Sequence, residues 1–426
     1  MQKNIIYPAK ILLPKDGLNY ERLSVIACDQ FTSQPEYWKA VKEHVGECPS
    51  TLNIILPEAF LEKRGVKKRI ENIQAAMREY RQTVLTKSIY GFAYTERTMK
   101  SGKIRCGLVA AVDLEDYSYE KGDKPLIRPS ENTVVSRIPP RLEVRRGACL
   151  ESPHIMMLID DDKKEIIESV ARRKESLQKL YDFDLMQGGG RLCGYAVTGQ
   201  EQIEEIQKMF AEIASSGSFD KKYPQAAGTA PIAMAVGDGN HSLATAKAYW
   251  EELKKGLSEQ ERENHPARYC LVEIVNIHSE AIEIEPIHRV FFGLSDKKLY
   301  AEAERFFSEN GSKPVKNGGY KFVVCAGGKE TVLRVRKNKK WALPTAAIEA
   351  FAEYITEKYS KVRVDYIHGE DTVRELCGKE AAGVILPPLE KGDLFKGVVL
   401  GGVLPRKTFS MGHAEEKRYY MECKDI

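Results

Sequence analysis

A turn between an apolar segment and an amphipathic segment carries the residues best suited to chemistry. It reads Gly237-Asp238-Gly239-Asn240-His241-Ser242 and follows the short apolar run 231–236. The glycines and the asparagine favour a sharp change of backbone direction, and the next residues repeat apolar side chains at the helical period as far as the stop at Gly256. A helix that begins here presents unpaired backbone N–H groups and the positive end of its dipole, which suit an anion such as phosphate.

Each side chain of this turn has a chemical use beside a phosphate. Gly237 and Gly239 let the anion approach the backbone, and Asn240, His241 and Ser242 can donate hydrogen bonds. Asp238 would bind Mg²⁺, accept a hydrogen bond from the ligand or handle a proton. The structural alternative is that Asp238 or Asn240 caps the helix and Gly237 makes a tight turn. The turn lacks the ending of a P-loop and the third glycine of a dinucleotide fingerprint.

Composition excludes several classes of protein. No apolar run in the 426 residues approaches the roughly 18 that span a bilayer, and the N-terminal residues lack the apolar core of a secretory signal, so a cytoplasmic protein is expected. The net charge of +4, from 65 basic and 61 acidic side chains, disfavours a dedicated nucleic-acid binder. The nine cysteines include no CxxC pair, which argues against a disulfide framework and a zinc site.

The elements that position the turn are predicted from periodicity. We expect strands at 5–13, 90–97, 104–114, 154–160, 268–278 and 282–292, and helices from 35, over 66–84, from 160 to about 181 and over 201–215. Ser33 is expected to cap the helix at 35, and 124–147 to be extended and rich in proline and arginine. From 295 the pattern becomes a smaller α/β unit. Hairpins mixed with crossovers predict an α+β fold.

The turn resembles the Asp-Gly-His-His-Arg signature of a bacterial and archaeal family known as domain of unknown function 1015. The resemblance covers nearly the whole chain and includes Cys28–Ser33, Leu126–Thr133, Pro286–Arg289 and Pro405–Phe409. The turn is also similar to the nucleotide loop of the ParB/sulfiredoxin-like fold. The resemblance therefore implies a mixed-sheet core of this type within a main domain at 1–294, followed by the α/β unit at 295–426.

Within that fold, free-serine kinases pair such a turn with an upstream His-Glu segment whose glutamate is the general base. The resemblance assigns this role to Glu131, with Ser130 in place of the histidine and Ser242 in place of the arginine that ends the turn. Arg128, Arg137 or Arg289 could supply the missing charge. The structural alternative is that Glu131 is a surface carboxylate paired with Arg128 or Arg137.

Two further segments match the family and carry basic groups. His288-Arg289 follows an acidic strand end and can hold a phosphate or carboxylate, although a buried structural histidine is an equal alternative. The segment 405–413 contains Arg406 and Lys407 and either folds back over the phosphate site or forms a solvated basic tail.

The leading hypothesis is a nucleotide-dependent kinase that phosphorylates a small hydroxyl-bearing metabolite such as free serine, with ATP or ADP as donor and Mg²⁺. Glu131, Asp238 and His241 would be the catalytic residues, and Asp238 the metal ligand. A nucleotide- or metabolite-binding regulator without turnover is the second hypothesis, and a ParB-like nucleic-acid binder or nuclease is the third. A homo-oligomer is compatible with each.

Overall fold

The chain folds into two compact units. The structure is a computed structural model that describes residues 3–378, 380–405 and 407–426. Unit 1 comprises the chain up to Ile282 together with Gly412–Ile426, and unit 2 comprises Glu283–Met411. The C-terminal segment thus returns to the unit formed by the first two thirds of the chain. Within the described ranges, no helix combines the length and apolar character that crossing a membrane requires.

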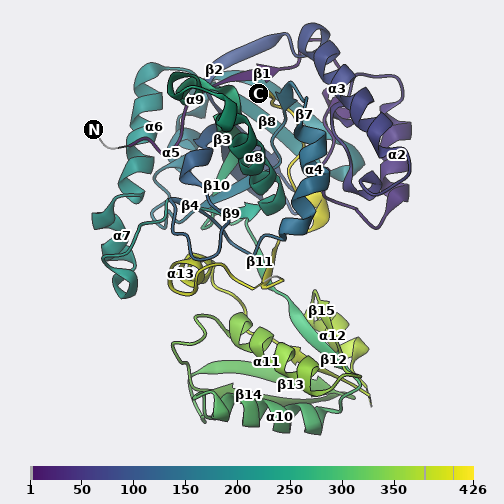
Figure 1. The fold of residues 1–426 in the computed structure, drawn as a ribbon, viewed down its shortest axis with the longest axis vertical. Coiled ribbons are helices and arrows are strands. Elements are labelled where there is room, and N and C mark those ends of the chain that lie inside the picture. The colour runs from purple at the N-terminus through teal and green to yellow at the C-terminus, as the bar shows by residue number, and fades with distance from the viewer. Residues whose placement is uncertain (1–2, 379, 406) are drawn as a thin grey trace. The chain divides into compact units, whose positions relative to one another are not determined.

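Unit 1 is built on a mixed sheet (Figure 1). Among the described residues it has nine strands in the order β4-β9-β6-β10-β3-β2-β8-β7, with β1 paired to β2. The β4–β9 and β6–β10 pairs are parallel, whereas β3–β10, β2–β3 and β6–β9 are antiparallel. The strands are β1 (Ala9–Leu13), β2 (Lys87–Thr98), β3 (Ile104–Asp113), β4 (Ile127–Pro129), β6 (Met156–Ile159), β7 (Gln178–Leu185), β8 (Gly190–Val197), β9 (Met234–Asp238) and β10 (Tyr269–Asn276).

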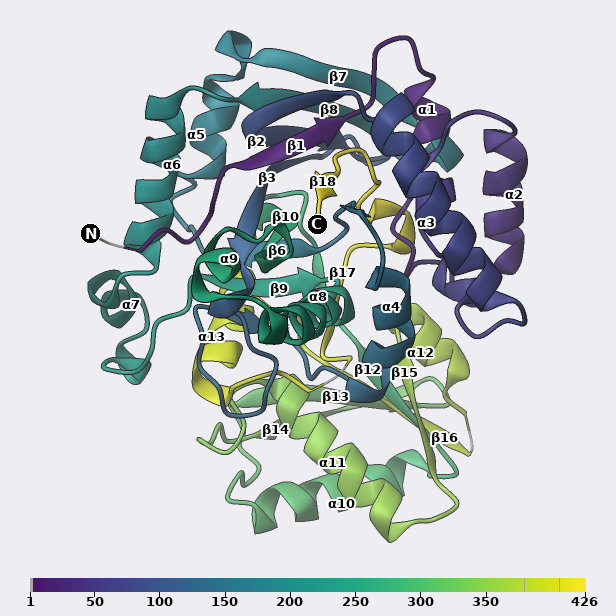
Figure 2. The same cartoon turned by 45° about the horizontal axis from the view of Figure 1, so that its top comes forward.

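Both faces of this sheet are covered, because successive side chains of a strand point to opposite faces. On β2, Ala93 belongs to the apolar core that includes α2 (Pro35–Val45) and α3 (Val66–Thr83). Its neighbours Phe92 and Tyr94 belong to the core on the other face, which includes α5 (Ile167–Arg172), α6 (Gln200–Ile213) and α8 (Asn240–Leu253). Figure 2 shows α2 and α3 at the opposite side of unit 1 from α5 and α6. The α+β class predicted from the sequence is confirmed.

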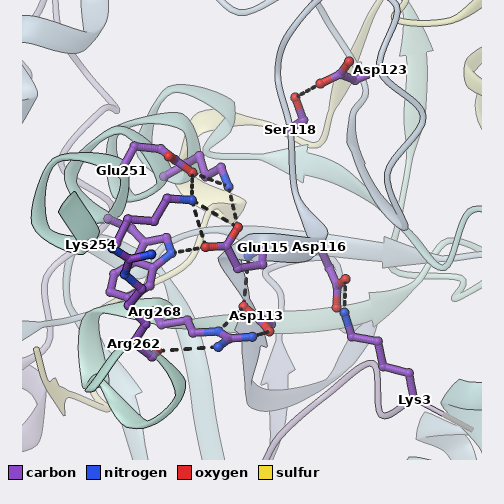
Figure 3. Close-up of polar contacts among 12 residues, drawn as sticks. Lys3, Asp113, Glu115, Asp116, Ser118, Asp123, Glu251, Lys254, Arg262 and Arg268 are labelled. Carbon is purple, nitrogen blue, oxygen red and sulfur yellow. Dashed lines mark hydrogen bonds and ion pairs between the residues drawn. The ribbon is translucent and has the colours of Figure 1, made fainter. Parts of the chain in front are cut away.

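Helix α8 is also fixed at its C-terminal end (Figure 3). The carboxylate of Glu115, which follows β3, accepts hydrogen bonds from Trp250 Nε1 at 2.7 Å and from Lys254 Nζ at 2.9 Å. Burial raises the pKa of Glu115, but these hydrogen bonds outweigh it and lower the pKa to about 2. Next to it, the buried carboxylate of Asp113 binds the guanidinium of Arg268 through two hydrogen bonds. Helix α8 begins within residues 237–242, the turn predicted to hold an anion and called the anion turn from here on. The helix is therefore held to the sheet at its far end.

Unit 2 is a smaller α/β layer structure. Among its described residues, a five-stranded sheet has the order β14-β13-β16-β12-β15, and β11 pairs with β17 separately. Three helices, α10, α11 and α12, accompany the sheet, and α13 follows. The elements are β11 (Ile284–Pro286), β12 (His288–Phe292), α10 (Asp296–Glu309), β13 (Tyr320–Ala326), β14 (Lys329–Val335), α11 (Pro344–Lys358), β15 (Arg363–Ile367), α12 (Glu370–Leu376), β16 (Ala381–Ile385), α13 (Lys391–Gly401) and β17 (Phe409–Met411).

Three local expectations are wrong. The helix expected from 160 to 181 is only α5, and β7 follows because residues from Gln178 onward pair with β8. The stretch expected to be extended contains α4 (Ile138–Arg145), in which a proline occupies the first turn, where its missing N–H costs nothing. Helix α2 has Gln34 as its N-cap residue without a side-chain cap, so Ser33 does not cap it. The helix expected over 66–84 and the strands expected at 90–97 and 104–114 are confirmed, and these two strands, β2 and β3, pair antiparallel.

Candidate functional site

The anion turn is made by Gly239. Strand β9 runs through Gly237 and ends at Asp238, so Gly237 belongs to the strand and does not make the tight turn that the structural alternative assigned to it. Gly239 has φ 80° and ψ 26° and is the N-cap residue of α8. A Cβ at this position would lie 3.0 Å from Ile155 Cα. Both the left-handed backbone and the close approach of the neighbouring chain therefore require glycine here.

The side chains at this turn are not used to cap the helix. The N-cap position of α8 has no side-chain hydrogen bond. Asp238 Oδ1 accepts the Gly239 N–H at 3.0 Å, which closes the turn before the helix begins. The Oδ1 atom of Asn240 is buried and lacks a hydrogen-bond partner. A buried acceptor without a partner is costly, so the capping alternative does not explain why Asn240 occupies the first helical position.

The segment that carries Glu131 lies beside the turn. Strands β4 and β9 are parallel, with Arg128 opposite Ala235 and Pro129 opposite Val236. Parallel strands end at the same edge of a sheet, so Glu131, two residues beyond β4, follows the same path as Asp238 at the end of β9. In this register each residue of β4 lies opposite the residue 107 positions later in the sequence. Val134 and His241 are also 107 positions apart, and the Val134 N–H donates to His241 Nε2 at 3.3 Å. Nε2 is therefore the acceptor, and Nδ1 of neutral His241 carries its proton.

A lysine from the C-terminal segment pairs with Asp238. Lys417 Nζ lies 3.1 Å from Asp238 Oδ2, and both side chains are largely buried. This contact places a positive charge at the turn. The family signature ends the turn with an arginine, and in this chain Ser242 stands in its place. The pair partly neutralises the charge of the Asp238 carboxylate.

A second polar chain starts at Ser242, in the first turn of α8. Its hydroxyl lies 2.7 Å from His154 Nε2, and His154 Nδ1 lies 2.8 Å from the hydroxyl of Tyr420. The Tyr420 hydroxyl accepts the Cys28 N–H at 3.0 Å, and Asp29 Oδ2 is 4.0 Å from His154 Nε2. Burial raises the pKa of Tyr420 well above its usual value, so this hydroxyl stays protonated. Residues from four separate segments thus meet at the start of α8.

The C-terminal segment that supplies Lys417 and Tyr420 is held by a buried charge network. Arg97 on β2 donates to the carbonyl oxygens of Glu415 and Lys417, and Arg105 on β3 donates to that of Glu416. Glu273 on β10, only 3% exposed, lies 3.8 Å from Arg105 Nη2 and 3.4 Å from Arg418 Nε. The remaining anion is Glu422, which bonds Arg418 and the hydroxyl of Tyr181.

This network changes the titration of its members. Burial raises the pKa of Glu273, but the neighbouring charges of Arg105 and Arg418 outweigh it and lower the pKa below its ordinary value. Burial, assisted by Arg105, lowers the pKa of Arg97 to about 10. Both side chains therefore stay charged near neutral pH, and the charges bind the returning segment to the sheet.

Arg128 is placed differently from the expectation. It is 5% exposed and donates to the carbonyl oxygens of Pro125, Ala230 and Pro231. Burial lowers the pKa of its guanidinium. These bonds hold the start of β4 to the segment before β9, which is a structural role, and a phosphate contact of Arg128 stays a prediction. Arg137 is exposed, and its carbonyl oxygen accepts a bond from Arg141.

The other basic residues predicted for the site belong to unit 2. His288 is buried, and its Nδ1 accepts the Leu386 N–H at 3.1 Å. Arg289 is fully buried, bonds Glu349 through Nε and Nη2, and lies over the ring of Tyr366. Lys407 adopts a positive φ of 56°, and its carbonyl oxygen accepts a bond from Arg289. Arg406 lies outside the described residues. Nucleotide contacts of these four residues stay predictions.

Sequence reasoning did not find three members of the site, namely His154, Lys417 and Tyr420. None stands in a motif, and the nearest of them in sequence to the turn is more than 80 residues away. Asp29 lies within Cys28–Ser33, one of the segments that match the family. Within the described ranges, no group of three or more His, Cys, Asp or Glu residues is arranged to hold a metal ion.

Comparisons with known proteins identify a family and remote structural neighbours. The model of the family described as "Protein of unknown function (DUF1015)" matches residues 12–363. A mutant free serine kinase in complex with AMP aligns with 74% of this chain and 90% of its own at 9% identity and a TM-score of 0.37. A mutant in complex with ADP aligns over 76% and 94% at 10% identity and 0.37.

A conserved hypothetical protein from Pyrococcus furiosus aligns over 75% and 94% at 10% identity and a TM-score of 0.34. At such values, no residue of these proteins is matched to a residue of this chain. A search of curated proteins gave no match.

Proposed function

The chain belongs to the family described as "Protein of unknown function (DUF1015)", and we propose that it is a nucleotide-dependent kinase that phosphorylates a small hydroxyl-bearing metabolite. One observation carries the proposal. The parallel pairing of β4 with β9 and the bond from Val134 to His241 bring the Glu131 segment beside the anion turn. Glu131 and Asp238, which are 107 residues apart in sequence, thus follow the ends of two neighbouring parallel strands, and this supports a shared site for the carboxylate and the proposed phosphate cradle.

The residues in the turn and beside it would each serve one part of phosphoryl transfer. Phosphoryl transfer depends mainly on positioning and on stabilising negative charge. The backbone N–H groups of Asn240 and His241, at the start of a 14-residue helix, would bind phosphate oxygens. Lys417 would offset their charge from the side of Asp238. Glu131 would accept the proton of the attacking hydroxyl, so that the oxygen forms its new bond to phosphorus as the bond to the nucleotide breaks.

The donor set at the turn fits a magnesium ion only in part. Asp238 offers one carboxylate, and its two oxygens already contact Gly239 N and Lys417 Nζ. Mg²⁺ at kinase sites is commonly held by one or two carboxylates together with substrate phosphates. Asp238 would therefore be the single protein ligand of an ion that arrives with ATP or ADP, where the metal neutralises phosphate charge.

The test is a phosphorylation assay with a matched pair of variants. Purified protein is incubated with ATP or ADP, Mg²⁺ and a panel of small hydroxy metabolites that includes free serine. We expect product from the wild type and from Glu120→Gln, an exposed glutamate upstream of the site. Glu131→Gln should lower the rate by about 10² or more, the usual contribution of a general base. Absence of both nucleotide binding and product in the wild type would overturn the proposal.

A second candidate, a nucleotide- or metabolite-binding regulator without turnover, is favoured by the Asp238–Lys417 ion pair. This pair engages the carboxylate that a kinase would use. Calorimetry that shows nucleotide binding, combined with no product from any hydroxy metabolite, would favour the regulator over the kinase.

A further inference from the structure

A pocket in unit 1 opens beside the first turn of α8. Its volume is about 160 Å³, and Ser242, His154 and Tyr420 are among the residues that line it. The remaining walls are mainly aliphatic and come from α3, α4, β10 and the segments around residues 55 and 150, for example Leu56, Met77, Val144, Ile155 and Leu271. A concave, mostly apolar site with a few convergent polar groups is the usual form of a small-molecule site.

The polar end of the pocket can bind a hydroxyl group. Ser242 has one hydroxyl donor and two acceptor lone pairs, and the contact with His154 uses one of these positions. The ring of His154 is held from its other side by Tyr420, whose hydroxyl is itself fixed by the Cys28 N–H. The orientation of the Ser242–His154 pair is thus set before a ligand enters, which lowers the entropic cost of binding.

The charges that line the pocket are matched in pairs. Arg141 Nε donates to Glu58 Oε1 at 2.7 Å, and Arg145 Nη2 bonds Glu151. Each charge on the lining already has a partner, and Glu151 is shared with the buried Lys424, whose Nζ lies 3.4 Å from its Oε1. An added ligand charge would therefore have to compete with an existing ion pair. Arg145 Nε is buried and lacks a hydrogen-bond partner. That atom has almost no accessible surface, so the polar end of the pocket is formed by Ser242, His154 and Tyr420.

We propose that this pocket binds a small uncharged alcohol with a compact apolar body, whose hydroxyl group contacts Ser242. A cavity of about 150 Å³ accommodates benzene, so the volume corresponds to roughly six to eight non-hydrogen atoms. Free serine fits this environment poorly, because both of its charged groups would lose water without gaining a partner. That the alcohol is also the phosphoryl acceptor rests on the proposed kinase function, whereas its binding does not.

The test is calorimetric titration of the full chain, without nucleotide, with benzyl alcohol, toluene and serine as probes. We expect saturable binding of benzyl alcohol, at least about fivefold weaker binding of toluene because the hydroxyl contact is missing, and no binding of serine at the same concentrations. Ser242→Ala should remove most of the difference between benzyl alcohol and toluene, because it deletes the group that distinguishes them.

Two variants that fill the pocket locate the binding. Val144→Phe and Ala148→Leu both place bulk on its lining and should abolish benzyl alcohol binding while the circular dichroism spectrum stays native. Val135→Phe makes the same change at a residue that is 64% exposed and should bind like the wild type. Two results would each overturn the proposal. One is that the wild type shows no saturable binding of benzyl alcohol, and the other is that both filled variants bind benzyl alcohol as tightly as the wild type.

The outcomes for the pocket and for the kinase are separable. Alcohol binding without phosphorylated product would support the pocket and count against the kinase. Phosphorylation of serine without alcohol binding would overturn the pocket proposal and leave the kinase in place.

Discussion

The substitution Glu273→Gln tests whether the buried charge network holds the C-terminal segment. The glutamine can still accept the hydrogen bond that Thr95 Oγ1 donates to Glu273 at 3.0 Å, so mainly the charge is lost. The buried side chains of Arg97, Arg105 and Arg418 then have Glu422 as the remaining buried anion of the network. Removal of one partner of a buried ion pair typically costs about 3–5 kcal/mol, because the other charge stays buried without compensation. We expect unit 1 to lose free energy of unfolding in this range.

The assay is urea denaturation followed by tryptophan fluorescence. Trp38 and Trp250 lie in unit 1 and Trp341 in unit 2, so a Trp341→Phe background confines the signal to unit 1. With a slope of about 3 kcal/mol per molar urea, the midpoint should fall by about 1–1.7 M at an unchanged slope. As a control, Glu263→Gln at an exposed position should change stability by less than about 0.5 kcal/mol. A loss below about 1 kcal/mol for Glu273→Gln would refute the argument, because the three arginines would then not need this anion.

Three further outcomes are expected. Gly239→Ala should destabilise the protein by at least about 1–2 kcal/mol, because of the left-handed backbone and the contact with Ile155; thermal unfolding checks this, and a melting temperature like the wild type's would contradict it. Lys417→Met should weaken ADP binding by about tenfold or more in calorimetry, since it removes a charge-assisted contact, and an unchanged affinity would exclude Lys417 from the phosphate site. The pKa of Glu115 is depressed from 4.5 to about 2, so its stabilising contribution is present above pH 4.5 and lost as the pH falls toward 2. In acid titrations of stability, Glu115→Gln should therefore lose less stability than the wild type between pH 4.5 and 2. An unaltered stability profile would contradict the role given to Glu115.

Local sequence was sufficient for the turn itself. The apolar run before it, the glycines within it and the helical repeat after it are all short-range signals, and the structure places a strand, a left-handed Gly239 and α8 there. The structural alternative, in which Gly237 makes the tight turn, is wrong, because residue type alone does not tell which of the two glycines leaves the strand. Only the position of Ile155 against the backbone decides that Gly239 makes the turn.

Local sequence patterns did not predict which segments pair as strands. The segment from Gln178 was predicted as the end of a helix, but it forms β7 because it pairs with β8. The region before Gly147 was predicted as extended because of its prolines, although Pro139 suits the first turn of α4. In both cases tertiary contacts or helix position outweighed the average preference of the residues.

The sequence by itself determined the α+β class, the strand–turn–helix unit and the family to which the chain belongs, because periodicity, glycine and a contiguous motif are local properties. Only the tertiary structure decided that Glu131 lies beside the turn, that Lys417 pairs with Asp238 and that Ser242 meets His154. These relations depend on the register of two parallel strands and on a C-terminal segment bound by buried charges. Neither leaves a periodic trace in the chain, because contacts between distant segments are fixed by packing and charge pairing in three dimensions.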